Sequence, residues 1–96
     1  MNGPLDTQTP QEYLKQISGQ DYPILNLIVQ CESGWKAHAK NPNSTASGLA
    51  QFIASTWAKW GQGDVFDPYN NLNAMVDLYR TQGTRPWDES RSCWQL

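Results

Sequence analysis

The sequence lacks features that several large classes of protein require. Its 96 residues contain no apolar run near the roughly 20 residues of a membrane span, and runs such as Leu27-Ile28-Val29 are short. Nine acidic residues against seven basic ones give a net charge of −2 and no cationic stripe that could replace the counterions of a nucleic acid. We therefore expect one small globular domain in water, with no nucleic acid partner and no membrane span.

The spacings typical of metal sites are also missing. The single histidine, His38, lies in a polar stretch, and the two cysteines form neither a CxxC pair nor a zinc ligand set. We interpret His38 as a solvated loop residue. We expect no metal, and no motif in the sequence indicates a cofactor.

Cys31 and Cys93 leave two interpretations open. A disulfide closing a loop of about 60 residues would stabilise so small a domain by about 4 kcal/mol in the chain-entropy estimate. The alternative is two buried free thiols in a cytosolic protein. We favour the disulfide, which predicts an extracellular, periplasmic or phage-associated protein. The first residues have neither the basic nor the apolar region of a signal peptide.

Helix signals cover most of the chain, and the alternation typical of strands is nearly absent, so we predict a mostly α fold. Thr9, Pro10 and Glu12 form the signature of a helix start, and Gly19 is expected to end that helix. We expect a loop or irregular hairpin over residues 35–47. Three further helices are predicted over about 22–33, 51–60 and 68–82, with residues 1–8 as a flexible segment and 9–96 as the domain.

Glu32 has the most unusual expected environment of the acidic residues. It follows the apolar face of the second predicted helix and lies at the C-terminal end, where the helix dipole disfavours a negative charge. Both effects would keep its carboxyl protonated to higher pH, as a general acid requires. Spacing alone still favours an ordinary solvated glutamate, or one hydrogen-bonded to Ser33.

Four sequence blocks with a characteristic ending occur in one specific order. They are Cys31-Glu32-Ser33-Gly34-Trp35, Asn41-Pro42-Asn43-Ser44, the stretch 46–57 with Gly48-Leu49-Ala50-Gln51, and the stretch 67–80 that starts Asp67-Pro68, followed by Pro86-Trp87 and Cys93-Trp94. Together they resemble the lytic transglycosylase (SLT-like) domain of the lysozyme-like superfamily. The Cys-Glu-Ser-Gly start is also similar to resuscitation-promoting factor domains.

The resemblance implies a small lysozyme-like helical fold with a cleft, and it identifies Glu32 as the sole catalytic acid. In that chemistry the glutamate protonates the glycosidic oxygen between N-acetylmuramic acid and N-acetylglucosamine of peptidoglycan. As a carboxylate it then takes a proton from the muramic 6-hydroxyl, which gives a 1,6-anhydro sugar. Because water is not the nucleophile, no second carboxylate is needed. The expected partner is a peptidoglycan glycan strand, bound by a monomer.

The resemblance also implies substrate contacts beside the acid. Gln51 matches the glutamine of the family's Gly-Leu-x-Gln block and is expected to hydrogen-bond the sugar, although a polar first-turn helix residue is an alternative. Ser47 is expected to donate into the cleft or to serve a turn. Tyr79, or Leu78 if the alignment slips by one residue, falls on the family's cleft tyrosine, whereas helical spacing places Tyr79 in the core.

Two small residues between these positions bear on the cleft. Gly48 is expected to let the backbone approach Glu32 closely. Ala50 is smaller than the residue usual in the family, often Met, so one subsite contact is expected to differ.

Five tryptophans are many for so short a chain. We expect Trp57 and Trp60, on a predicted helix, to lie in the core, because large rings dominate small cores. Trp35, Trp87 and Trp94 lie in predicted loops or the tail, where a ring can stack on a pyranose. Trp87 is the predicted sugar platform.

Two other functions remain open at this stage. A hydrolytic muramidase of the same fold would use Glu32 with a bound water and leave a reducing end. A peptidoglycan- or oligosaccharide-binding module would keep the fold without turnover.

Overall fold

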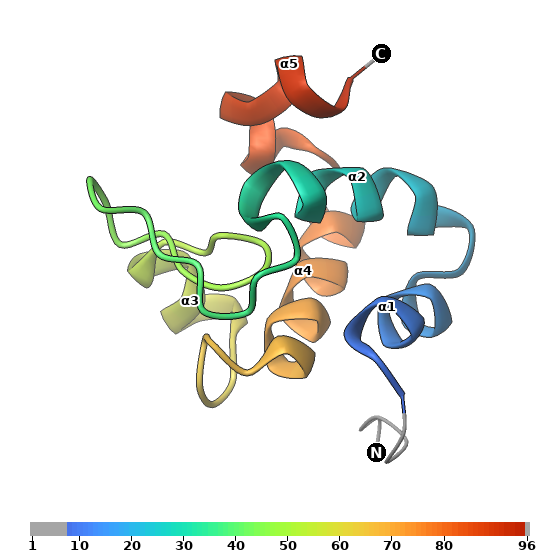
Figure 1. The fold of residues 1–96 in the computed structure, drawn as a ribbon, viewed down its shortest axis with the longest axis horizontal. Helices are drawn as coiled ribbons and strands as arrows, with labels where there is room; N and C mark the ends of the chain where they lie inside the picture. Colours follow the sequence, from blue (N-terminus) through green and yellow to red (C-terminus); the bar gives the residue numbers. More distant parts are fainter. Residues whose placement is uncertain (1–7, 96) are drawn as a thin grey trace.

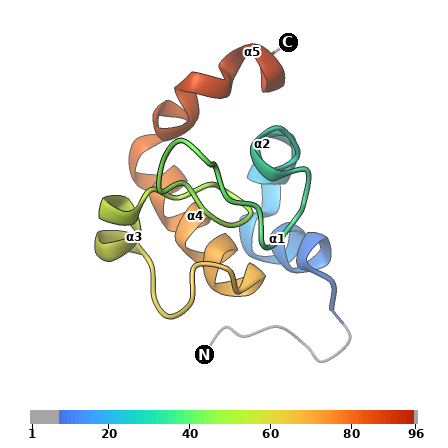
Figure 2. The ribbon, with the colours of Figure 1, turned by 60° about the vertical axis from the view of Figure 1, so that its left-hand side comes forward.

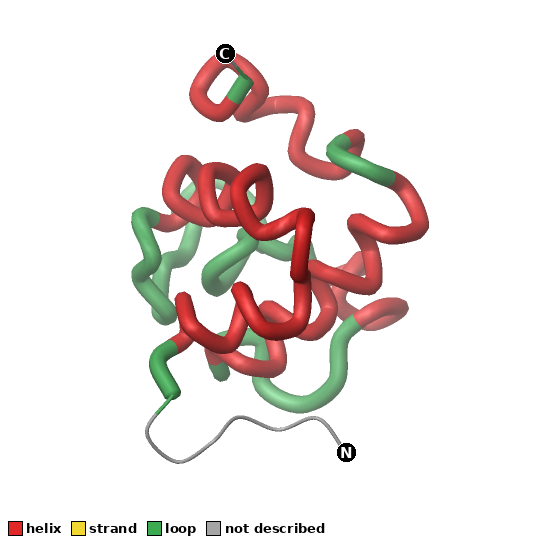
Figure 3. The backbone as a smooth tube through the Cα atoms, turned by 90° about the vertical axis from the view of Figure 1, so that its right-hand side faces the viewer, coloured by secondary structure: helices red, strands yellow, loops and turns green. Residues whose placement is uncertain are grey.

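The computed structural model describes residues 8–95, so nearly all of the expected flexible segment 1–8 lies outside the described residues. Helices account for its regular structure, and no strand occurs within residues 8–95, which confirms the mostly α prediction (Figure 3). None of the described helices is long and apolar enough to cross a membrane. The helices are α1 (Pro10–Ser18), α2 (Tyr22–Ser33), α3 (Ala54–Trp60), α4 (Pro68–Gln82) and α5 (Arg91–Trp94), with short 3-10 helices η1 (Gly19–Asp21) and η2 (Arg85–Ser90).

Local signals set the helix ends as expected. Glu12 N donates to Thr9 Oγ1 over 3.2 Å, and Thr9 N donates to Glu12 Oε1 over 2.8 Å, which completes a capping box at α1. Asp67 accepts from two backbone amides at the start of α4. Gly34, in the left-handed conformation with φ 61°, ends α2 two residues after Glu32.

The longest helix, α4, forms the centre of the molecule. Figures 1 and 2 show it between α3 on one side and α1 on the other, and both of these helices pack on it. Its apolar face, with Leu72, Met75 and Leu78, is buried against Leu25, Ile28 and Leu49 among other core residues. This single core keeps the end of α2 at a constant position relative to α4 and the loop before α3.

The third helix is three residues shorter than predicted. Ser47 and Phe52 pair through two backbone hydrogen bonds of 3.0 Å each, and Gln51 has φ 56°. A left-handed residue cannot occupy the first turn of an α-helix. The tight turn over residues 47–52 therefore replaces the predicted first turn, and α3 begins at Ala54.

Asn71, which the sequence analysis did not single out, holds this turn against α4. Its side chain is fully buried, accepts from Ala50 N over 2.8 Å and donates to Val65 O over 2.9 Å. Gly48 has φ 80°, and a Cβ there would collide with the Asn71 amide. The glycine therefore makes room for Asn71, a reason that the sequence did not indicate, and the expected close approach to Glu32 stays a prediction.

The C-terminal segment packs on α2. A disulfide joins Cys31 to Cys93 of α5, with the two Cα atoms 6.0 Å apart. Trp87 and Trp94 are each only 5% exposed, and Figure 1 shows η2 and α5 lying over the end of α2. The C-terminal segment is thus part of the folded domain, and it lies beside Glu32, the residue that follows Cys31.

Candidate active site

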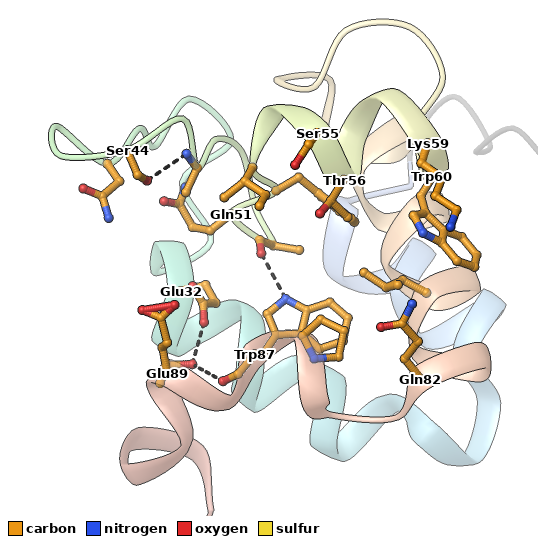
Figure 4. Close-up of a pocket in the computed structure, with 18 of the residues that line it drawn as sticks. Glu32, Ser44, Gln51, Ser55, Thr56, Lys59, Trp60, Gln82, Trp87 and Glu89 are labelled. Carbon is orange, nitrogen blue, oxygen red and sulfur yellow. Dashed lines mark hydrogen bonds between the residues drawn. The ribbon is translucent and has the colours of Figure 1, made fainter.

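A cleft of about 830 Å³ opens between the end of α2, the loop before α3, α3 itself, the end of α4 and η2. Figure 4 shows Glu32 and Glu89 toward one end of it and Lys59, Trp60 and Gln82 toward the other. The lining is mixed, with amide, hydroxyl and charged side chains beside apolar ones, which suits a sugar polymer better than an apolar ligand. Other lining residues include Asn41, Ser44, Gln51, Ile53, Ser55, Leu78, Trp87 and Ser90.

Glu32 is partly buried in this cleft, and among residues 8–95 its carboxylate has one hydrogen-bond partner. Ser90 Oγ donates to Glu32 Oε2 over 2.5 Å, from a position 58 residues further along the chain. Ser90 Oγ in turn accepts the indole N–H of Trp94 over 2.9 Å and has the Trp87 carbonyl as a second acceptor at 3.1 Å. The carboxyl is therefore held through Ser90, whose own position is fixed by the Trp94 indole and the Trp87 backbone carbonyl of the C-terminal segment.

Burial raises the pKa of Glu32 above its ordinary value, the hydrogen bond from Ser90 lowers it in part, and the nearby Glu89 charge raises it further. The net direction is upward. The carboxyl consequently stays protonated to higher pH than an exposed glutamate, which is the state that a general acid needs.

Gln51 lies in the cleft wall with its amide group fixed by the turn that interrupts the predicted helix. Its Nε2 donates to Gly48 O over 2.9 Å and to Ala39 O over 3.1 Å. These two bonds use both amide hydrogens, so Oε1 is the atom of this side chain that remains an acceptor for a ligand.

Two of the predicted substrate contacts do not line the cleft. Ser47 is 6% exposed, and its hydroxyl donates to Thr45 O over 2.9 Å. It therefore stabilises a turn and does not donate into the cleft. Tyr79 packs against the core cluster, and its neighbour Leu78 faces the cleft instead. Helical spacing therefore predicted the core position of Tyr79 correctly, whereas the resemblance to the family had placed it in the cleft.

Trp87 and Trp60 lie in surroundings that differ from those expected. Trp87 borders the cleft, but its ring is buried and its N–H donates to Ala50 O over 3.1 Å, so it forms a fixed wall rather than an open platform. Trp57 and Trp60 both pack against the core from partly buried positions. Trp60, expected only in the core, also lines the cleft.

Sequence reasoning missed Ser90, Glu89 and Lys59 as cleft residues. Ser90 and Glu89 lie in a tail whose only strong signals were its tryptophans and Cys93. The expected Cys31–Cys93 bond was the one signal that could have found them, because it brings residues 89–93 next to Glu32. No cluster of His, Cys, Asp or Glu able to hold a metal occurs in the part of the chain that the structure describes.

Comparison with known proteins agrees with this geometry. Residues 10–85 match the transglycosylase SLT domain family. The chain belongs to that family. The match includes Glu32, Gln51 and Trp60 and ends before Glu89 and Ser90.

The curated relatives that the chain matches are also named as transglycosylases. The chain is 41% identical over 70 residues to "Probable transglycosylase SceD 2" of Staphylococcus saprophyticus, an alignment that covers 66% of this chain and 28% of that protein. It is 38% identical over 91 residues to "Probable transglycosylase SceD" of Staphylococcus aureus strain Newman, covering 84% of this chain and 39% of that protein. The chain thus spans well under half the length of either relative. No solved structure matches it.

Proposed function

We propose that this domain is a lytic transglycosylase that cleaves the β-1,4 bond between N-acetylmuramic acid and N-acetylglucosamine in peptidoglycan. Glu32 acts first as general acid and then as general base. The observation that carries the proposal is the position of Glu32: partly buried in the cleft, at the end of a helix, within the segment that matches the family.

In the first step neutral Glu32 donates its proton to the glycosidic oxygen. The bond from this oxygen to the anomeric carbon of the muramic residue breaks, and the N-acetylglucosamine side leaves with a free hydroxyl. In the second step the Glu32 carboxylate removes the proton from the muramic 6-hydroxyl, and that oxygen bonds to the anomeric carbon. Glu32 regains its proton, and no water is consumed.

Ser90 supports both protonation states of Glu32. When Glu32 is ionised, the Ser90 hydroxyl donates to it, and a hydrogen bond to a charged group is stronger than one to a neutral group. When Glu32 is neutral, the Trp87 carbonyl offers the Ser90 proton another acceptor. Trp94 keeps Ser90 Oγ in place in each case. Ser90 is thus a positioning residue for the acid.

The cleft wall provides contacts suited to a glycan with peptide substituents. Gln51 Oε1 accepts from a sugar hydroxyl or amide, the exposed Ile53 packs on an apolar sugar face, and Lys59 pairs with carboxylates of the peptide or lactyl groups. The domain acts outside the cytosol, where the Cys31–Cys93 bond persists. One chain supplies the whole cleft, so a monomer suffices.

One observation favours a hydrolytic muramidase as the second candidate. Glu89 also lines the cleft, and its charge acts on Glu32. A second carboxylate could activate water, as it does in inverting glycosidases.

Digestion of purified peptidoglycan, followed by mass spectrometry of the released fragments, tests the proposal. The transglycosylase forms anhydromuramic ends, which are lighter by one water than reducing ends. Reducing ends alone would establish the hydrolase. If the protein sediments with peptidoglycan as strongly as Glu32→Gln and neither releases fragments, the domain is a binding module.

A further inference from the structure

Trp60 separates the cleft from a second, smaller hollow. This hollow has a volume of about 180 Å³ and lies where α3 ends, against the first half of α4. Trp60 lines both spaces, so a ligand in either one reaches the same ring. The residues around the second hollow are Trp60, Gln62, Asn70, Asn73, Ala74 and Asp77.

The indole of Trp60 is the only one within residues 8–95 that makes no hydrogen bond. The N–H groups of the other four tryptophans donate to Asn26, Gly63, Ala50 and Ser90. An indole N–H usually finds a partner when the ring is buried against protein. Trp60 is partly buried and packs on the core, yet its N–H is available to a ligand.

The second hollow continues the line of the cleft along α4. Ala74, Leu78 and Gln82 follow one another at intervals of four residues and so form one ridge of the helix. Ala74 borders the hollow, whereas Leu78 and Gln82 border the cleft. Ala74 and Leu78 are only 3% and 2% exposed, so a polymer that leaves the cleft reaches the hollow over the Trp60 ring, which borders both spaces, and not along the helix itself.

The polar groups of the hollow have the chemistry of a saccharide site. The side chains of Gln62, Asn70 and Asp77 make no hydrogen bond or ion pair with other described residues. Asn73 Oδ1 accepts from Tyr13 Oη over 2.6 Å, which leaves its NH2 group as a donor. Amides and a carboxylate complement hydroxyl and acetamido groups, and the Trp60 ring complements the apolar face of a pyranose.

We propose that this hollow is a distal binding site for one N-acetylhexosamine unit of the glycan strand that occupies the cleft. The ligand assignment rests on the proposed function. The volume is below the roughly 300–1,000 Å³ of sites for drug-sized ligands, which suits a single sugar ring. The site strengthens the binding of long strands and leaves the binding of short ones unchanged.

NMR titration of the intact protein with β-1,4-linked N-acetylglucosamine oligomers tests the proposal. The hexamer is expected to shift the Trp60 indole signal, the backbone amides of Asn70 and Asn73, and the cleft signals. The dimer is expected to leave the Asn70 and Asn73 signals unchanged. A hexamer that shifts only cleft signals would overturn the proposal.

Asp77→Asn, with Asp21→Asn as a matched control, measures the contribution of the hollow. Both carboxylates make no side-chain hydrogen bond within the described residues, and only Asp77 borders the hollow. Asp77→Asn replaces a charge-assisted hydrogen bond to the sugar by a neutral one, so it is expected to weaken hexamer binding about fivefold, with dimer affinity unchanged. Equal hexamer affinities for the two variants would contradict the proposal.

The two proposals fail separately. Hexamer shifts in the hollow without cleavage of peptidoglycan would leave the distal site standing and remove the proposed enzyme activity. Cleavage of peptidoglycan without those shifts would leave the proposed enzyme activity standing and remove the distal site.

Discussion

Ser90 Oγ donates to Glu32 Oε2 over 2.5 Å while it accepts the indole N–H of Trp94 over 2.9 Å. The candidate acid at the end of α2 is therefore oriented by residues from the far end of the chain. The disulfide from the adjacent Cys31 to Cys93 holds the same two segments together covalently. The position of the carboxyl thus depends on the C-terminal segment, which lies outside the part of the chain that matches the family.

Removing the Ser90 hydroxyl is expected to extend activity to higher pH while lowering its maximum. The hydrogen bond from Ser90 lowers the pKa of Glu32, so Ser90→Ala raises that pKa further. Because the first step needs protonated Glu32, the high-pH limb of kcat/KM moves upward. The maximum falls about tenfold, since hydrogen bonds to charged groups contribute about 1.5–3 kcal/mol.

Two controls accompany the Ser90 variant. Ser90→Thr keeps a hydroxyl and is expected to restore part of the activity and the original pH limb. Ser55→Ala removes a cleft hydroxyl that makes no hydrogen bond within the described residues, and its pH profile should not move. A high-pH limb that stays in place in Ser90→Ala would refute the positioning role.

Neutralising Glu89 distinguishes the two enzyme mechanisms. The Glu89 charge raises the pKa of Glu32, so Glu89→Gln lowers that pKa and moves the high-pH limb of kcat/KM downward. In the transglycosylase, kcat below that limb stays within about twofold and anhydro products persist. A loss of kcat by a factor of about 100 or more would instead identify Glu89 as a catalytic base.

Glu32 is expected to reduce stability at neutral and higher pH. Its folded-state pKa is raised, mainly by burial, so over the range between the unfolded and the folded pKa the native state binds more protons than the unfolded state. The free energy of unfolding therefore falls as pH rises through this range. Glu32→Gln should be more stable than the parent protein at pH 8 and differ less at pH 4. Urea unfolding at both pH values checks this; equal differences would contradict it.

The disulfide is expected to support both stability and activity. The double variant Cys31→Ser/Cys93→Ser should lose about 4 kcal/mol of unfolding free energy in the chain-entropy estimate for a loop of this length. Activity should fall beyond what unfolding explains, because α5 no longer holds Ser90 beside Glu32. Denaturant unfolding and assays well below the melting temperature measure the two effects. Two titratable thiols in the unreduced, denatured parent protein would exclude this explanation.

Asn71→Ala is expected to destabilise the domain by about 2–4 kcal/mol. It leaves the buried Ala50 N–H and Val65 carbonyl without their partner and opens a cavity in the core. Asn70→Ala, at the neighbouring position, is the matched control, because the Asn70 side chain makes no hydrogen bond within the described residues. Denaturant midpoints of the two variants give the comparison; similar midpoints would contradict the role of Asn71.

Local sequence determined most of the helices. The capping box at Thr9, the cap at Asp67 and the glycine after α2 act through contacts between residues two to four positions apart, so their sequence signals are complete in themselves. The same holds for the location of Glu32 at a helix end. The start of α3 could not be predicted in this way, because Asn71, 21 residues from Ala50, stabilises the turn that displaces its first residues.

The surroundings of Glu32 depended on tertiary structure. Sequence analysis selected Glu32 and Gln51, and both line the cleft, but Ser47 and Tyr79 face other parts of the molecule. Burial of a ring and the partner of a carboxyl are settled by segments far apart in the chain, and no local pattern records them. The sequence by itself determined which residue could act as the acid. Only packing of the C-terminal segment on α2 decided that Ser90 holds it, and only packing of α3 on α4 decided that Trp60 borders the cleft.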